Sequence, residues 1–364
     1  MENAVEKEKL ITPMRKVAYD WLKLIGALLV VVGHYYAMLP AGDEMLLWRK
    51  NGLCQKVVMN GGYAIILFFA ISGYMLMEHH CKNGEMTFHE YITPKILRLW
   101  PLHFITMLFC FVVQQIRIAK GLDFFCYQAN SITDLIVGSF FGGHLVTPEL
   151  SLNGPSWTMS VTFFCYIVFF VSTKYDKTIK RNAVFLAAAI FNSYDLYMVL
   201  SGRNSGVPYI IDSVQYSAAF FVGCLIYEVC RMADNNRNIK RLLDRGSVLV
   251  ISFFTVLFIF SAGMKIWGSD GYTFFNIYVI APLLLYWCRN NKINRILQKI
   301  PVTPGKLYFP IYLLHFPIML LAETVSQIKN QSINWASISV FVIYMLILIS
   351  CSKIVSILLN KIKI

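Results

Sequence analysis

The sequence predicts an all-α polytopic membrane protein, a bundle of about ten transmembrane helices with both termini in the cytoplasm. Three observations predict this class: the composition, the recurrence of long apolar segments, and the uneven placement of basic residues. Hydrophobic residues make up 57% of the 364 residues and charged residues 15%, whereas soluble domains contain about 25% charged residues. An ordinary soluble domain is therefore excluded.

Apolar stretches long enough to cross a hydrocarbon core of about 30 Å recur along the whole chain. The least regular of them is interrupted by Asn192 and Asp195. A shorter, glycine-rich apolar stretch at 132–146 is expected to be a re-entrant or interfacial piece. The predicted spans are 17–40, 57–77, 99–118, 156–173, 183–200, 209–230, 247–267, 272–288, 307–324 and 334–358.

Basic residues are concentrated in alternate loops. Of the 33 Lys and Arg residues, 23 fall in loops on the side of the N-terminus, 7 on the opposite side and 3 within spans. This is the positive-inside pattern, and it places both termini in the cytoplasm. The formal net charge of +13 is thus explained by topology and lipid contact, not by nucleic-acid binding.

No linker or repeat divides the chain, so we expect a single integral membrane domain over residues 1–364 with no appended soluble domain. The charged first sixteen residues do not resemble a cleavable signal peptide. The nine cysteines form no CxxC pair and read as small core residues; no metal site is predicted. The longest outward connection, about 119–155, is a candidate place to hold a substrate.

The first predicted span carries a polar stripe. Lys23 and His34 are eleven residues apart, which puts them within about 20° of one helix face and about 16 Å apart along the axis. Asp20 shares that face. Ionisable groups at this depth are rare and usually functional, so the stripe should face a cavity, a partner charge or a ligand. The structural alternative is that Lys23 snorkels to the interface and His34 bonds a neighbouring carbonyl.

This stripe suits chemistry that links two compartments. With the N-terminus inside, Lys23 lies in the cytoplasmic half of the span and could hold an anionic donor. His34 lies in the outer half, where an imidazole can act as general base on a hydroxyl. An extended phosphopantetheine arm has about the right length to bridge them.

Four further segments contain candidate residues. Ser72 and Gly73 lie in the apolar FFAISGYMLM, where small residues could also serve close helix approach. Arg98, in KILRLWP, suits a phosphate or carboxylate but could equally set topology, and Pro101 is placed to shape the helix start. NGPSWTMSVTFFCY opens the fourth span and reads as a turn and an interfacial Trp. YFPIYLLHFP puts a second histidine, His315, deep in an apolar run.

The ordered blocks DWLKLIGALLVVVGH, FFAISGYML, RLWP, PSWTMSVTFFCY and YLLHFP resemble the integral membrane acyltransferase family 3, the membrane O-acetyltransferases of cell-envelope polysaccharides. The resemblance covers essentially the whole chain. It implies a multi-pass enzyme of the bacterial inner (cytoplasmic) membrane. It also implies acetyl-CoA as the donor and a hydroxyl of an O-antigen of lipopolysaccharide, a capsule or an exopolysaccharide as the acceptor. Macrolides are acceptors of other members.

Two positions depart from the family pattern. Lys23 replaces the arginine of the Arg-x10-His motif on the first span, which keeps the charge but loses the planar fork. Thr162 stands where many members have a glutamate after the tryptophan. Help for His34 must then come from another span, since Asp20 is about 21 Å away along its own helix; His315 is a candidate.

The resemblance, together with the burial of these residues, implies the following roles. The catalytic residues would be His34 and Asp20. His34 would deprotonate the acceptor hydroxyl or accept the acyl group transiently. Lys23 and Arg98 would hold donor phosphates or polarise the thioester, and Ser72 and Tyr74 would line the donor channel. The residues expected on the acceptor side are Trp157, His315 and Asn153.

Two other classes stay open. A transporter or flippase for glycan intermediates would also place polar residues near the midplane, and a non-catalytic scaffold would explain Thr162 and Lys23. The expected partners are acyl-CoA, a carbohydrate and the lipid bilayer. The sequence leaves open the glycan and its hydroxyl, acetyl against succinyl or a longer acyl group, direct against covalent transfer, and homo-oligomer formation.

Overall fold

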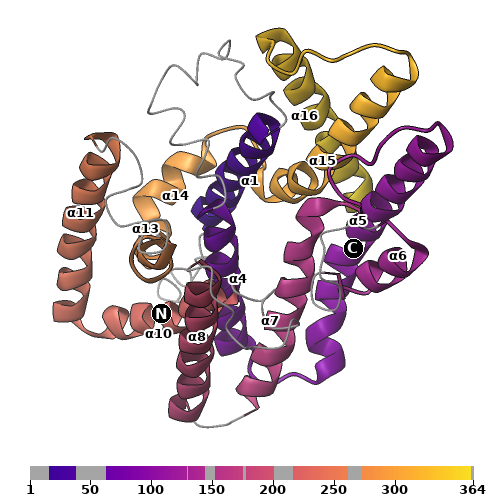
Figure 1. Ribbon diagram of the computed structural model, residues 1–364. Coiled ribbons are helices and arrows are strands. Elements are labelled where there is room, and N and C mark those ends of the chain that lie inside the picture. Colours follow the sequence, from indigo (N-terminus) through magenta and orange to yellow (C-terminus); the bar gives the residue numbers. More distant parts are fainter. Residues whose placement is uncertain are drawn as a thin grey trace, which may run out of the picture.

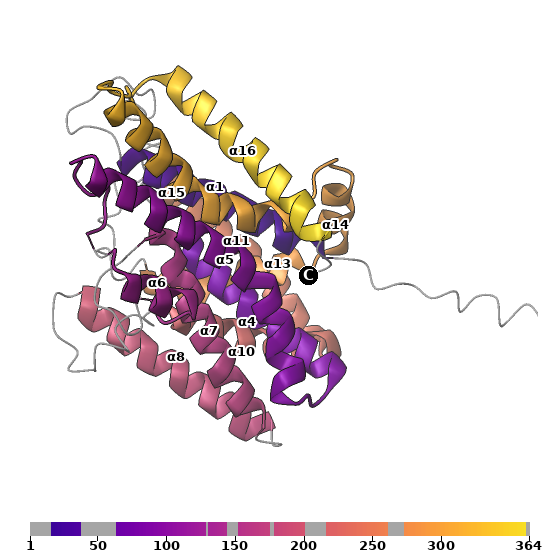
Figure 2. The same cartoon turned by 90° about the vertical axis from the view of Figure 1, so that its right-hand side faces the viewer.

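The computed structural model describes residues 16–37, 63–128, 130–143, 152–174, 178–200, 216–260 and 273–361. Every regular element in these ranges is helical, and α5, α15 and α16 run side by side along one common direction (Figure 2). Around the centre of the bundle lie α1 (Val17–Ala37), α4 (Tyr63–Asn83), α5 (Phe88–Ala119), α7 (Trp157–Thr173), α10 (Ser217–Asn235) and α15 (Pro304–Ile328) (Figure 1). The others are α6 (Ile132–Ser139), η1 (Gly154–Ser156), α8 (Thr178–Leu200), α11 (Arg237–Phe260), η3 (Asn276–Ile280), α13 (Ala281–Cys288), α14 (Asn291–Gln298) and α16 (Ile338–Lys361).

Six helices of the described chain are long and apolar enough to cross a membrane: α1, α4, α5, α7 with η1, α15 and α16. They coincide with six of the ten predicted spans, and the chain is a multi-pass membrane protein. The other four predicted spans correspond to α8, α10, α11 and the η3–α13 pair. Charged residues such as Arg181 in α8 and Glu228 in α10 lower the hydropathy of two of these helices. Ten spans and cytoplasmic termini therefore stay predictions.

The helix α5 begins eleven residues before the predicted start of its span. Thr87 caps it: the Thr87 hydroxyl accepts from Glu90 N, and the Glu90 carboxylate accepts from Thr87 N at 2.9 Å, a reciprocal arrangement that fixes a helix start. Pro101, expected at the helix start, lies inside the helix instead. At 32 residues α5 is about 48 Å long, so it exceeds the hydrocarbon thickness.

The apolar stretch predicted as a re-entrant or interfacial piece contains the two-turn helix α6, which lies against α5. Trp100 Nε1 donates to Ser139 O at 2.9 Å, and His103 Nε2 donates to Gly138 O at 2.9 Å. Residues 144–146 of that stretch lie outside the described residues. The amphipathic helix α14 was not predicted. Among the described cysteines, 110, 165, 224, 230 and 288 are buried as expected, whereas 81 and 126 are exposed.

The apolar core has two parts. One gathers buried side chains of α4, α7, α8, α10 and α13; the other gathers those of α1, α5, α15 and α16. In the first part α4 and α10 cross closely at Gly73 and Gly223. A Cβ at Gly73 would lie 1.9 Å from Phe220 O, so the close crossing requires glycine there. The polar residues of α1 lie in the second part, facing α15.

Candidate active site

The polar stripe of α1 faces α15 at three successive levels. Asp20 lies against the start of α15, where a Cβ on Gly305 would be 2.7 Å from its Oδ2. Lys23 Nζ lies 5.3 Å from the ring centroid of Tyr308. His34 meets the second membrane histidine, His315. The structure thus brings together the two histidines that the sequence placed on different spans, and it leaves Asp20 at the other end of the stripe.

The two histidines are joined by a hydrogen bond of 2.7 Å between His34 Nδ1 and His315 Nε2. Their ring centroids are 5.0 Å apart. His315 is fully buried, whereas His34 is exposed. The second ring nitrogen of His315, Nδ1, lies 2.6 Å from Tyr312 O.

This geometry fixes the proton positions when both rings are neutral. A carbonyl oxygen only accepts, so His315 Nδ1 carries the proton that binds Tyr312 O. His315 Nε2 is then an acceptor, and His34 Nδ1 must donate to it. The lone pair of His34 is left on Nε2, the nitrogen not used in the pair. An imidazole oriented in this way through its other nitrogen is arranged to accept a proton.

Pro317, inside the continuous helix α15, explains how a carbonyl becomes available near His315. Pro317 has no N–H, so Leu313 O loses its helical partner. Asn153 Nδ2 donates to this carbonyl at 3.0 Å, and Tyr344 OH donates to His315 O at 3.2 Å. Asn153 is fully buried. The structure therefore places Asn153, expected on the acceptor side, as a tie between η1 and α15.

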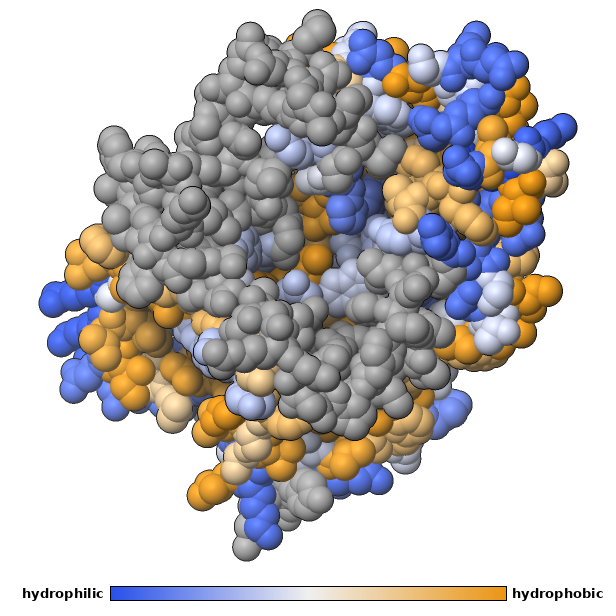
Figure 3. Space-filling model, in the orientation of Figure 1, coloured by the Kyte–Doolittle hydropathy of each residue, from blue (hydrophilic) through white to orange (hydrophobic). Residues whose placement is uncertain are grey.

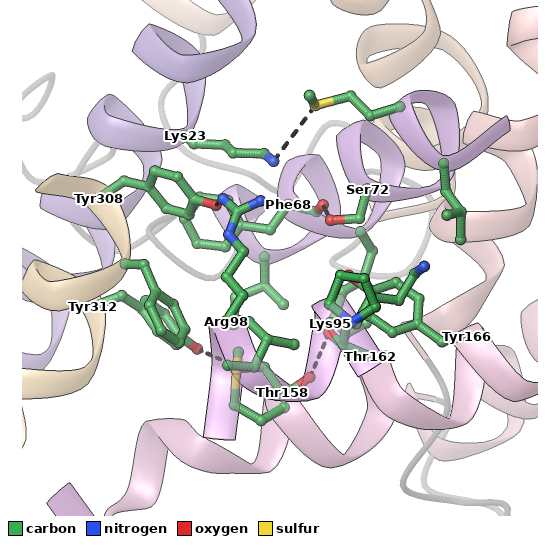
Figure 4. Close-up of a pocket in the computed structure, with 18 of the residues that line it drawn as sticks. Lys23, Phe68, Ser72, Lys95, Arg98, Thr158, Thr162, Tyr166, Tyr308 and Tyr312 are labelled. Carbon is green, nitrogen blue, oxygen red and sulfur yellow. Dashed lines mark hydrogen bonds between the residues drawn. The ribbon is translucent and has the colours of Figure 1, made fainter. Parts of the chain in front are cut away.

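A cavity of about 370 Å³ lies between α1, α4, α5, α7 and α15 (Figure 4). Three cations line it, Lys23, Lys95 and Arg98, and the described lining contains no carboxylate. Its other polar lining residues are Ser72, His79, Thr158, Thr162, Tyr166, Tyr308 and Tyr312.

Neutral groups hold the three cations in place. Arg98 donates to Tyr308 OH at 2.9 Å. Lys23 Nζ lies over the Tyr308 ring and 3.7 Å from Met75 Sδ. Lys95 Nζ donates to Tyr91 O at 2.6 Å and lies 3.5 Å from the centroid of that ring. Because the described lining holds three cations and no carboxylate, the cavity can attract an anion.

Of the remaining predicted site residues, Ser72 reaches the cavity and two others do not. Ser72 lines the cavity and donates to Phe68 O at 2.7 Å. Tyr74 is buried on another face of α4, with its ring 5.4 Å from that of Tyr19. Two residues correspond to about 200° of helix rotation, so Ser72 and Tyr74 cannot share a cavity wall. Trp157 is half-buried, with its ring 5.4 Å from Tyr216, and does not line the cavity.

Sequence reasoning missed several cavity residues, among them Lys95, Thr158, Tyr308 and Tyr312. A signal for three of them was present. Lys95 precedes Arg98 by three residues and shares its face of α5. Tyr308 and Tyr312 precede His315 by seven and three residues, which places all three within about 60° of one face of α15.

The described chain is thus an apolar helical bundle that holds a histidine pair and a cation-lined cavity. The chain belongs to acyltransferase family 3: its residues 16–357 match the acyltransferase domain of that family. An O-acetyl transferase of Shigella phage Sf6 is 25% identical over 217 residues, which is 56% of this chain and 60% of the phage protein. The match thus spans less than two thirds of that relative. No solved structure matches the chain.

Proposed function

We propose that this protein transfers an acetyl group from acetyl-CoA to a hydroxyl of a cell-envelope carbohydrate at the bacterial inner membrane. The acceptor is an O-antigen, capsule or exopolysaccharide. One observation carries the proposal: the hydrogen-bond chain from Tyr312 O through His315 to His34. This hydrogen-bond chain orients the exposed imidazole of His34 so that it can act as a base within the helical bundle.

In this mechanism His34 Nε2 removes the proton from the acceptor hydroxyl as its oxygen bonds to the thioester carbonyl carbon. The carbon–sulfur bond then breaks, and the leaving thiolate takes the proton back from His34. His315 acts by accepting from His34 Nδ1, which stabilises the imidazolium that forms. This role of His315 differs from the acceptor contact expected from sequence. Asp20 acts only through the start of α15, against which it lies.

The donor enters through the cation-lined cavity. Lys23 and Arg98 bind its phosphates, and Lys95 joins them. Ser72 lines the passage. The distance from Lys23 to His34 is about 16 Å along α1, which an extended phosphopantetheine arm spans. Tyr74 lies outside this passage, and its proposed part is to pack α4.

The acceptor approaches from the opposite end. α1 begins beside α14, since Ala18 N donates to Asn294 Oδ1 at 3.0 Å. Figure 2 shows α14 at the right of the bundle and the other end of α1, which carries His34, at the left, and this left side is the face seen in Figure 3. That face is hollowed at its centre (Figure 3). The name of the phage relative, an O-acetyl transferase, supports acetyl as the group and oxygen as the acceptor atom. Asn153 and Trp157 contribute by fixing the η1–α7 corner.

The test compares envelope glycans by mass spectrometry from cells that express no protein, the wild type, His34→Gln or His103→Gln. His103 is the matched control, because it is also a histidine of a membrane-spanning helix but hydrogen-bonds to Gly138 O and not to the histidine pair. We expect the mass of one acetyl group per acylated sugar in the wild type and His103→Gln. His34→Gln should lose it, with an activity reduced about 10²–10⁴-fold at equal protein level.

Two outcomes would contradict the proposal. Undiminished acetylation by His34→Gln would remove His34 from the chemistry. A wild-type protein that adds no acetyl group to any envelope glycan would exclude these acceptors, and the transporter and scaffold alternatives would then be tested first.

A further inference from the structure

The wall of the cavity contains two hydroxyl groups that lie close to each other. Thr158 and Tyr312 both line it, and each is only 4% exposed. Thr158 Oγ1 lies 3.0 Å from Pro155 O, and Tyr312 OH lies 3.2 Å from the same oxygen. The two hydroxyls are 3.2 Å apart (Figure 4). Tyr312 precedes His315 by three residues, so this pair lies one helical turn from the histidines.

The other short hydroxyls in the cavity wall are already used by their own helices. Ser72 Oγ donates to Phe68 O at 2.7 Å, and Thr162 Oγ1 donates to Thr158 O at 2.7 Å. Each is a bond to the preceding turn that satisfies the only proton of the hydroxyl. Tyr308 OH binds Arg98 at the level of Lys23, one turn further from the histidines than Tyr312.

Thr158 and Tyr312 differ from these because two donors share one carbonyl oxygen. If one hydroxyl turns its proton towards a ligand, the other still satisfies Pro155 O. No buried polar group is left without a partner, so the change has little cost. One proton of this pair is therefore available to a bound molecule.

Tyr312 is the member suited to turn. Thr158 makes the shorter bond to Pro155 O, within its own turn of chain. The ring of Tyr312 is held edge-on by Phe68, with centroids 5.6 Å apart, so its hydroxyl is presented at a fixed place. The carbonyl of the same residue binds His315. Tyr312 thus fixes both a hydroxyl in the donor cavity and the orientation of the proposed base.

We propose that the Tyr312 hydroxyl donates a hydrogen bond to the carbonyl oxygen of the acyl thioester. The inference rests on the proposed function, in which His34 is the base. When the acceptor oxygen bonds to the carbonyl carbon, the electron pair of the C=O bond moves to its oxygen and the proton of the acceptor goes to His34. The Tyr312 proton then stabilises the oxyanion until the carbon–sulfur bond breaks and the thiolate takes the proton from His34.

The test measures kcat and KM for the acyl donor in purified Tyr312→Phe. This substitution keeps the ring, its contact with Phe68 and the carbonyl that binds His315. Tyr35→Phe is the matched control, since Tyr35 is buried next to His34 in sequence and its hydroxyl donates to Trp335 O at 2.8 Å, away from the cavity.

Loss of an oxyanion donor should lower kcat about 10²–10³-fold with little change in KM, while Tyr35→Phe keeps the wild-type kcat. A wild-type kcat for Tyr312→Phe, or a raised KM with unchanged kcat, would overturn the inference. If Tyr312 served folding alone, Tyr312→Phe would lower the melting temperature but would not lower kcat at an unchanged KM.

A second variant tests the shared proton. In Thr158→Val, Pro155 O depends on Tyr312, so kcat should fall by less than in Tyr312→Phe, and Thr158→Ser should restore it. A wild-type kcat in Thr158→Val would count against the arrangement. His34→Gln separates the two proposals: if it stays active, the proposed function fails, whereas an inactive His34→Gln with a fully active Tyr312→Phe contradicts only the present inference.

Discussion

Two helix–helix interfaces of this bundle differ in how closely the helices approach and in what lies between them. Where α4 crosses α10, the backbones touch: a Cβ at Gly73 would lie 1.9 Å from Phe220 O, and one at Gly223 would lie 2.1 Å from Ala70 O. Where α1 faces α15, side chains fill the space between the helices. Lys23 lies over the Tyr308 ring, and His34 is bonded to His315.

The difference shows what an ionisable group needs in an apolar medium. Small residues give close packing but leave no room for a polar side chain. The α1–α15 interface keeps that room, and α15, which contains two prolines, supplies the hydrogen-bond partners. Pro317 frees one carbonyl near His315, and the ring nitrogen of His315 takes another. Stability and chemistry are thus assigned to separate interfaces, which mutations can test.

The largest expected effect comes from Gly73→Val, which breaks the α4–α10 interface. The added side chain overlaps backbone that cannot move aside, so we expect a loss of more than about 4 kcal/mol and little folded protein. Size-exclusion chromatography of detergent extracts would measure it. Ser72→Ala is the neighbouring control and should remain folded. A monodisperse, stable Gly73→Val protein would show that the close crossing is not required.

A smaller effect is expected at the α1–α15 interface, where His315→Leu should remain folded but lose activity. The hydrogen bond to a charged His34 is worth about 1.5–3 kcal/mol, so kcat/KM should fall about 10–100-fold. His315→Gln keeps an acceptor near the position of Nε2 and should retain more activity than His315→Leu. Equal activities of the two variants would mean that His315 does not act as an acceptor for His34.

Most of the fold could be predicted from the length of the apolar segments, whereas helix starts depend on capping. Six predicted spans match helices long enough to cross the membrane. The start of α5 was missed because the reciprocal cap of Thr87 and Glu90 outweighs the polar character of its first turns. Composition alone does not show whether a helix such as α10 crosses the membrane, since its Glu228 forms a buried ion pair with Arg181 of α8 that offsets the charge.

The site residues were predictable where their position depends on helical spacing alone. The stripe of Lys23 and His34 faces a cavity and a partner, as the sequence indicated, and Arg98 lines the same cavity as Lys23. The meeting of His34 with His315 depends on how α1 packs on α15, which no local pattern contains. The bond of Asn153 to the Leu313 carbonyl could not be predicted, because that carbonyl lacks a helical partner only since Pro317 has no N–H.

The smallest expected effect is that of Lys23→Arg, which restores the arginine of the family motif. Lys23 has no carboxylate partner in the described cavity lining and lies 5.3 Å from the Tyr308 ring centroid. A guanidinium can stack on that ring and bind a phosphate through two bonds, so the KM for the acyl donor should be unchanged or lower.

Lys23→Met is the control that removes the charge; it should raise the KM about 10-fold or more, because a charge-assisted hydrogen bond is lost. Steady-state kinetics with varied donor separates the cases. A Lys23→Arg protein as impaired as Lys23→Met would mean that the ammonium itself, and not positive charge at this level of α1, is what the cavity requires.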